Sequence, residues 1–213
     1  MHTTLKDKLD LTTWKRRDHF NFFKTFQQPL WGITTTINCT QAYAYCKAAN
    51  VSFFMYYLYQ SLRVANSIRE FKYRIEGQDV YEYQSISGSI TVLRNDETFG
   101  FAYFDDNEDF SIFSKETKSN LTATKVTSGL YANADINNVI YYSVLPGINF
   151  TSMQHAQHFS AQNSVPMIVF GQYHHLNGQM LLPISIHVHH ALCDGVHVEK
   201  YLQLFQSKME LKS

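Results

Sequence analysis

The chain has 213 residues, and its 18 basic and 18 acidic side chains give a formal net charge of zero. Balanced charge excludes the basic surface that nucleic-acid binding requires, so we expect no nucleic-acid partner. The chain is long enough to bury a sizeable core, and no linker-like segment interrupts it. We therefore predict a single domain over residues 1–213.

The cysteines and the apolar segments indicate the cellular compartment in which the protein is expected. The chain has three cysteines, Cys39, Cys46 and Cys193, and no two of them form a CxxC motif. The first ten residues, MHTTLKDKLD, lack an apolar signal region. No apolar run approaches the ~18 residues needed to cross a bilayer. We therefore expect a cytoplasmic protein with reduced thiols and no membrane partner.

The first half of the chain predicts helices and strands in mixed order. From the N-terminus we expect a polar lead-in over 1–15, a helix over 16–27, a strand over 31–39, helices over 40–49 and 52–68, and a hairpin of 71–76 with 80–83. Thr40 is the expected cap of its helix.

The second half continues the mixture. We expect strands over 89–93 and 98–104, a surface helix over 108–126, strands over 139–145 and 148–152, a hairpin of 167–173 with 179–187, and a helix from 195 to about 209. The Asn177-Gly178 pair is the clearest hairpin signal in the chain. Because strands and helices do not alternate strictly, we predict an α/β fold, a two-layer sandwich with a mixed β-sheet.

Polar chemistry is concentrated where the last strand meets the last helix, in the stretch IHVHHALCDGVH (186–197), which holds four of the ten histidines. His190 lies where the strand pattern gives way to a loop, from which an imidazole can reach a cleft. A histidine imidazole is the usual side chain for moving protons at neutral pH. Asp194, followed by a glycine, can fold back to support that loop.

Other interpretations of these histidines are structural or metal-binding. We expect His187 and His197 to be structural. A metal site could use His187 and His189 with Asp194, or the histidine pair at 174–175. The strong zinc spacings are missing, so the sequence favours no metal site.

The residues also support a resemblance to a known family. HHALCDG (189–195) matches the HHxxxDG signature of coenzyme A-dependent acyltransferases. Around it, the chain resembles the chloramphenicol acetyltransferase family in LLPISIHVHHALCDGVHV (181–198), WKRRDHF (14–20), DETFGF (96–101) and SVLPGINFTS (143–152). The blocks occur in the family's order and span nearly the whole chain.

The resemblance implies an activity, an assembly and catalytic roles. It implies acetyl-CoA dependent O-acetylation, with chloramphenicol as the acceptor and antibiotic resistance as the biological role. It also implies a homotrimer whose active sites lie between subunits. His190 would be the general base, Asp194 would pair with Arg16 to fix the loop, and the Ser152 hydroxyl would stabilise the oxyanion.

The resemblance further implies binding residues. The acceptor pocket would include Phe22, Phe23, Phe99, Tyr131 and Val169, and Tyr173 would touch the coenzyme. At Val169 the family usually has a threonine, and at Gly147 a tryptophan. These departures leave open a different hydroxyl or amine acceptor; a metal-binding hydrolase or an inactive binding protein are further alternatives. Phe22 and Phe23 could equally belong to the core.

Overall fold

A computed structural model describes residues 5–130, 137–156 and 163–212. The strands are β1 (Lys6–Lys8), β2 (Leu30–Asn38), β3 (Tyr73–Glu76), β4 (Asp79–Tyr83), β5 (Ser87–Leu93), β6 (Phe99–Phe104), β7 (Val139–Val144), β8 (Met167–Phe170), β9 (His174–Leu176) and β10 (Gln179–His189). The helices are α1 (Arg17–Phe23), α2 (Thr40–Ala48), α3 (Phe53–Asn66), α4 (Phe110–Lys125) and α5 (Gly195–Met209), with a 3₁₀ turn, η1 (Arg69–Lys72). Within these ranges no helix combines the length and the apolar character needed to span a membrane.

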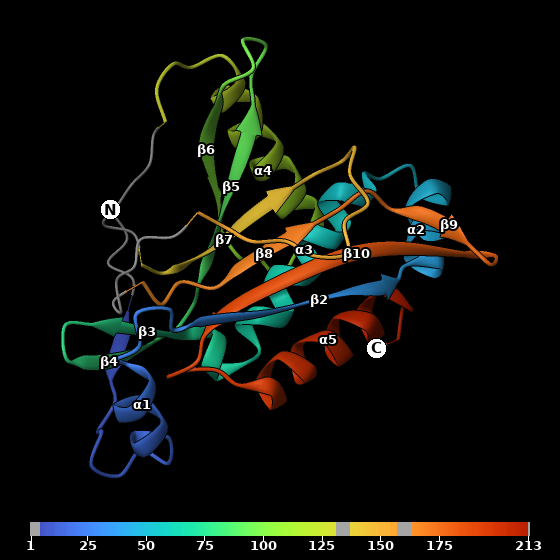
Figure 1. Cartoon of the computed structure of the whole chain (residues 1–213). Helices are drawn as coiled ribbons and strands as arrows, with labels where there is room; N and C mark the ends of the chain where they lie inside the picture. The colour runs from blue at the N-terminus through green and yellow to red at the C-terminus, as the bar shows by residue number, and fades with distance from the viewer. Residues whose placement is uncertain (1–4, 131–136, 157–162, 213) are drawn as a thin grey trace.

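The main sheet runs in the order β2-β10-β8-β7-β5-β6, with β9 beside β10. Strand β7 is parallel to β5 and β8, whereas the other pairs are antiparallel, so the sheet is mixed as predicted. A small sheet, β1-β4-β3, lies at one end near α1 (Figure 1). The longer helices cover the main sheet, which gives the predicted two-layer sandwich (Figure 1).

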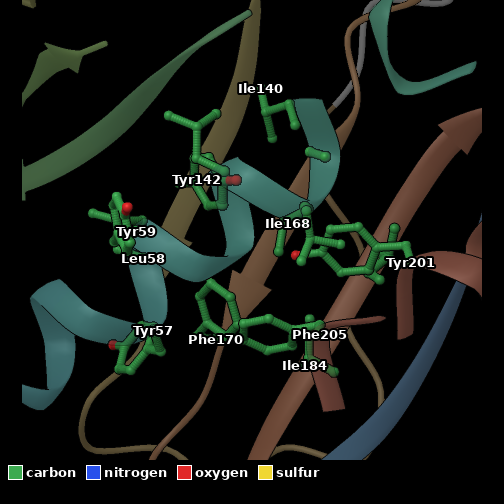
Figure 2. Packing of buried hydrophobic residues seen from close by; sticks show 14 of the residues in the cluster. Tyr57, Leu58, Tyr59, Ile140, Tyr142, Ile168, Phe170, Ile184, Tyr201 and Phe205 are labelled. Atoms are coloured by element: carbon green, nitrogen blue, oxygen red, sulfur yellow. The ribbon is translucent and has the colours of Figure 1, made fainter. Parts of the chain in front are cut away.

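Alternation along β10 separates the two faces of the sheet. Ile184, Ile186 and Val188 belong to the core under the helices, so the residues between them face the other way. Figure 2 shows this core, in which the Phe170 ring of β8 lies 4.7 Å from that of Tyr57 on α3 and 5.9 Å from that of Phe205 on α5. The face opposite the helices therefore carries the alternate side chains of β10, among them Ser185 and His187.

A polar contact ties three elements together inside the core. The hydroxyl of Ser61 on α3 lies 3.0 Å from that of Tyr142 on β7 and 2.5 Å from that of Tyr201 on α5. All three side chains are buried. Because each hydroxyl has a partner, these polar groups hold the helices in one position on the sheet at little cost.

Some local predictions were wrong. The helix expected over 16–27 covers only Arg17–Phe23, and across the Asn177-Gly178 turn the partner of β10 is β9 and not the segment 167–173. Residues 148–152 form no strand, because the Ile148 N–H donates to the Leu145 carbonyl in a turn and its carbonyl accepts only from Gln172. Thr40 does not cap α2 but is its first residue. The side chain of Asn38 takes that role instead, since its Oδ1 accepts from both the Thr40 N–H and hydroxyl.

Candidate active site

His190 directly follows the end of β10, and neighbouring groups fix its orientation. The backbone N–H of His190 donates to the Pro29 carbonyl at 2.9 Å, and its backbone carbonyl accepts from Arg16 Nη2 at 3.3 Å. The Phe23 ring stacks on the imidazole, with centroids 3.9 Å apart and planes 10° from parallel, and Trp31 lies 5.5 Å away. Nδ1 of His190 is buried without a hydrogen-bond partner in the part of the chain the structure describes. Packing therefore holds this ring.

The loop after His190 is anchored by an ion pair between distant parts of the chain. Arg16 Nη1 lies 2.6 Å from Asp194 Oδ2, and the two side chains are 13% and 28% exposed. Burial by itself would raise the pKa of Asp194, but the hydrogen bond and charge of Arg16 outweigh it and hold that pKa below its ordinary value. The predicted Arg16–Asp194 pairing is therefore confirmed as a contact.

His197 has a structural position, as expected. Its Nδ1 accepts a hydrogen bond from the Asp194 N–H at 3.0 Å, so this nitrogen carries no proton there. Burial lowers the pKa of His197, which agrees with a neutral ring. The contact supports the start of α5.

A row of side chains crosses the open face of the main sheet. Ser143 on β7 is paired with Val169 on β8, Val169 with Ser185 on β10, and Ser185 with Thr34 on β2. Thr34 Oγ1 donates to Ser185 Oγ at 3.1 Å, and at the other end Thr91 Oγ1 lies 3.5 Å from Ser143 Oγ. Val169 and Ser185 are fully buried, whereas Ser143 and Thr34 are half-buried.

An apolar cavity of about 1170 Å³ lies at the β7 end of this row, where Ser143 and Thr91 line it. Tyr173 lies at its wall, 5.4 Å from Tyr43 and 5.5 Å from Phe53 between ring centroids. Three lysines also line it, one on α2 and two on α4: Lys47, Lys118 and Lys125. The cavity thus combines an aromatic wall with positive charge.

A second cavity, of about 640 Å³, lies at the β2 end of the row, where Thr34 lines it. Strands β2 and β10 form one side through Gly32 and His187, and the segment 151–155 forms the other. Its lining is mainly polar. The two cavities therefore occupy opposite ends of one cross-strand row.

The predicted catalytic residues lie in two separate places in the structure. Arg16 and Asp194 lie beside His190, but Ser152 does not join them: it is exposed and lines the polar cavity. His190 is not among the described residues that line either cavity. Within the residues that the structure describes, one chain therefore does not bring the predicted base and the two cavities into a single pocket.

The predicted binding residues also lie in separate places. Phe99 and Tyr173 line the apolar cavity, and Val169 lies in the covered middle of the row. Phe22 is 61% exposed and packs edge-on against Phe23, whose ring lies on His190. The predicted aromatic at position 131 lies outside the described residues.

Ser143 was missed by the sequence interpretation. It is the first serine of the same block, SVLPGINFTS, whose last serine is Ser152. Only Ser143 lines the cavity that contains Tyr173 and pairs with Val169. The alternation of β7 could have indicated it, because Tyr142 points to the core and Ser143 must point away.

The metal alternative finds no support in the arrangement of its suggested ligands. Within residues 5–130, 137–156 and 163–212, no three histidine, cysteine or acidic side chains are grouped so as to hold an ion. His189 Nδ1 accepts from the Ala191 N–H at 3.2 Å, and Asp194 is paired with Arg16.

The fold is shared with acyltransferase catalytic cores. The truncated catalytic core of the 2-oxoacid dehydrogenase multienzyme complex from Thermoplasma acidophilum superposes with a TM-score of 0.65 at 14% identity, covering 92% of this chain and 94% of that one. At this identity the likeness shows the fold alone.

The family is shown by closer matches. The family model described as "Chloramphenicol acetyltransferase" matches residues 5–206. A solved chloramphenicol acetyltransferase has a TM-score of 0.89 and 30% identity, covering 95% of this chain and 99% of its own. The chloramphenicol acetyltransferase of Proteus mirabilis is 25% identical over 203 residues, which is 93% of this chain and 92% of the relative. The chain belongs to the chloramphenicol acetyltransferase family and is an acyltransferase.

Replacing Arg16 by Met should lower the free energy of unfolding by about 2 kcal/mol at pH 7, because Asp194 is left without its partner. Since the folded pKa of Asp194 is depressed, this stability is present above the unfolded pKa near ~3.9 and is lost as the pH falls through the lower folded value. Urea unfolding at pH 7 and at about pH 3 would measure the difference at each pH.

Arg17→Met is the matched control, because Arg17 pairs with Asp18 at the surface with side chains 51% and 85% exposed. It should change stability by no more than about 0.5 kcal/mol. An Arg16→Met deficit of equal size at both pH values would contradict a role for the Asp194 charge.

Proposed function

We propose that the protein transfers the acetyl group of acetyl-CoA to a hydroxyl of chloramphenicol, acting as a cytoplasmic resistance enzyme. The observation that carries the proposal is His190, held at a strand end by ring stacking and by the Arg16–Asp194 pair, in a chain of this family. The Escherichia coli relative named chloramphenicol acetyltransferase 3 is 25% identical over 201 residues.

His190 is the general base in this proposal. As the acceptor oxygen attacks the thioester carbonyl, the imidazole takes the hydroxyl proton. The tetrahedral intermediate then collapses, the C–S bond breaks, and the imidazolium returns the proton to the departing CoA sulfur. The stacked Phe23 ring and the anchored loop keep the imidazole in one orientation, so little reorganisation is needed before transfer.

The apolar cavity is the proposed acetyl-CoA site. The coenzyme carries an adenine ring, an extended pantetheine arm and phosphates, and the cavity offers each a matching environment. Tyr173 and Tyr43 provide aromatic surface, and Lys47, Lys118 and Lys125 provide positive charge near phosphates.

Ser143 is the proposed hydroxyl that stabilises the oxyanion, in place of the predicted Ser152. It lines the coenzyme cavity at the point where the cross-strand row begins, so it is placed to meet the thioester end of the pantetheine arm. Val169 beside it has no hydrogen-bonding group, so the hydroxyls at that end of the row are those of Ser143 and of Thr91, which lies 3.5 Å from it.

A homotrimer with shared sites explains the division of these residues. His190 lies outside the lining of both cavities. Strand β2 also ends the order of the main sheet, so its outer edge pairs with no strand in the described chain, although Asn38 at its end bonds the Gln206 side chain. An unpaired edge of this length is a natural place for contact with another subunit. We propose that His190 of one subunit serves the cavities of its neighbour.

The function is tested by release of free CoA thiol from acetyl-CoA, with and without chloramphenicol. We expect release that depends on chloramphenicol and falls by at least ~10²-fold in His190→Ala, because the general base is removed. His175→Ala is the matched control, since His175 is an exposed residue of β9, and it should retain wild-type turnover. Near-normal turnover in folded His190→Ala would overturn the mechanism.

The choice between the two serines is tested by Ser143→Ala and Ser152→Ala. Ser143→Ala should reduce kcat by ~10²–10³-fold with little change in the KM for either substrate, because an oxyanion donor acts in the transition state. Ser152→Ala should retain kcat within about threefold. The reverse pattern would restore the role to Ser152.

A further inference from the structure

Arg94 is a buried arginine whose guanidinium donates to neutral oxygens. It directly follows β5, and only 8% of it is exposed. Nε donates to the Thr124 carbonyl at 3.2 Å, Nη1 to the Phe99 carbonyl at 3.0 Å and Nη2 to the Gly129 carbonyl at 2.5 Å. A guanidinium carries five N–H donors in a fixed plane, so this one side chain holds three separate stretches of backbone together.

The three stretches meet at the end of α4. Thr124 lies in the last turn of α4, where the carbonyls have no partner further along the helix. The carbonyl end of a helix is partially negative, so a buried positive charge is stabilised there. Gly129 belongs to the segment after α4, and Phe99 is the first residue of β6. Arg94 therefore fixes the end of α4 against β6.

The segment DETFGF (96–101), which leads into β6, is built around this side chain. Asp96 Oδ1 accepts from the N–H and the hydroxyl of Thr98, at 3.1 Å and 2.7 Å. The Thr98 hydroxyl oxygen in turn accepts from Arg94 Nη1 at 3.4 Å. A Cβ at Gly100 would lie 2.2 Å from Arg94 Nη2, so a glycine is needed there to leave room for the guanidinium.

The helix that Arg94 fixes carries two of the three lysines of the apolar cavity. Four residues of α4 line this cavity, at the i, i+3, i+4 and i+7 positions that share one helix face: Lys118, Leu121, Thr122 and Lys125. No aspartate or glutamate is among the described residues that line it. Arg94 is not among those residues either, so its contacts place it one step away from a ligand in the cavity.

We propose that Arg94 is a positioning residue for coenzyme binding: by clamping the end of α4 to β6, it holds Lys118 and Lys125 where they meet the phosphates of CoA. The inference rests on the proposed function and deepens it, because it names what sets the charged wall of the coenzyme cavity. The bonds of Arg94 use the fork geometry of its guanidinium as well as its charge. A change that keeps the charge but moves the guanidinium therefore weakens CoA binding too.

The first test measures the Kd for CoA by titration calorimetry. Arg94→Met should raise this Kd about tenfold, because displaced lysines make weaker charge-assisted contacts with phosphate. Gly100→Ala keeps the charge of Arg94 but displaces its guanidinium, so it should raise the Kd by a similar factor. Arg94→Lys, which keeps the charge but has one donor nitrogen, should also raise it. The KM for chloramphenicol should stay within about twofold of wild type in all three.

A double-mutant cycle tests whether Arg94 acts through the two lysines. Lys118→Gln combined with Lys125→Gln should raise the Kd for CoA about tenfold, and adding Arg94→Met to this pair should raise it no further. Lys115→Gln is the matched control, because Lys115 is an exposed residue of α4 that is not among the described lining residues. It should leave the Kd within about twofold of wild type. The thermal transition of each variant checks its folding.

The outcomes separate this inference from the proposed function. Wild-type affinity for CoA in the folded Arg94 variants overturns the positioning role, and so do effects of Arg94→Met and of the lysine pair that simply multiply. CoA binding with the expected cycle but without transfer to chloramphenicol overturns the proposed acceptor and leaves the positioning role in place. Absence of CoA binding by wild-type protein overturns the proposed coenzyme site and this inference with it.

Discussion

Strand β10 is the constraint on which the rest of the structure depends. Nine of its residues pair with β2, four with β8 and three with β9. This register sends Ile184 and Ile186 into the core and Ser185 and His187 to the open face. A shift by one residue would bury the polar set under the helices and expose the apolar set, so the core fixes the position of every polar group that β10 presents. The same register brings the strand to its end at His189 and leaves His190 just beyond the sheet.

The Arg16–Asp194 pair completes this arrangement by fixing the loop between β10 and α5. The two residues are 178 positions apart, and Arg16 also reaches the carbonyl of His190. A partly buried ion pair of this kind contributes little net stability compared with apolar packing, but breaking one side of it leaves a charge without a partner. Its main effect is to give the loop one conformation. The stacked Phe23 ring then limits the imidazole to one plane.

Local sequence patterns predicted those parts of the fold that local physics decides. The Asn177-Gly178 turn was foreseen because both residues adopt the positive φ angles, 49° and 78°, that this pair tolerates. The alternating segment 148–152 misled the prediction, since of its five residues only Phe150 is buried and the segment joins no ladder of hydrogen bonds. The alternation of β7 could indicate only that Ser143 points away from the core; its position beside Val169, and the pairing of His155 with His187, could not be foreseen. Both depend on which strands become neighbours, and no single segment of the chain encodes that.

The described chain therefore has two cavities at the ends of one polar row and a base that lines neither of them. In the proposed enzyme, His190 of one subunit acts on substrates bound by another. The most direct measurement is the acetyltransferase activity of hybrids, made by co-folding His190→Ala subunits with Ser143→Ala subunits. A shared site predicts activity far above that of either parent, because some interfaces then combine an intact His190 with an intact Ser143. Hybrid activity no higher than that of the parents would contradict a shared site, because a site within one chain would always carry one of the two substitutions.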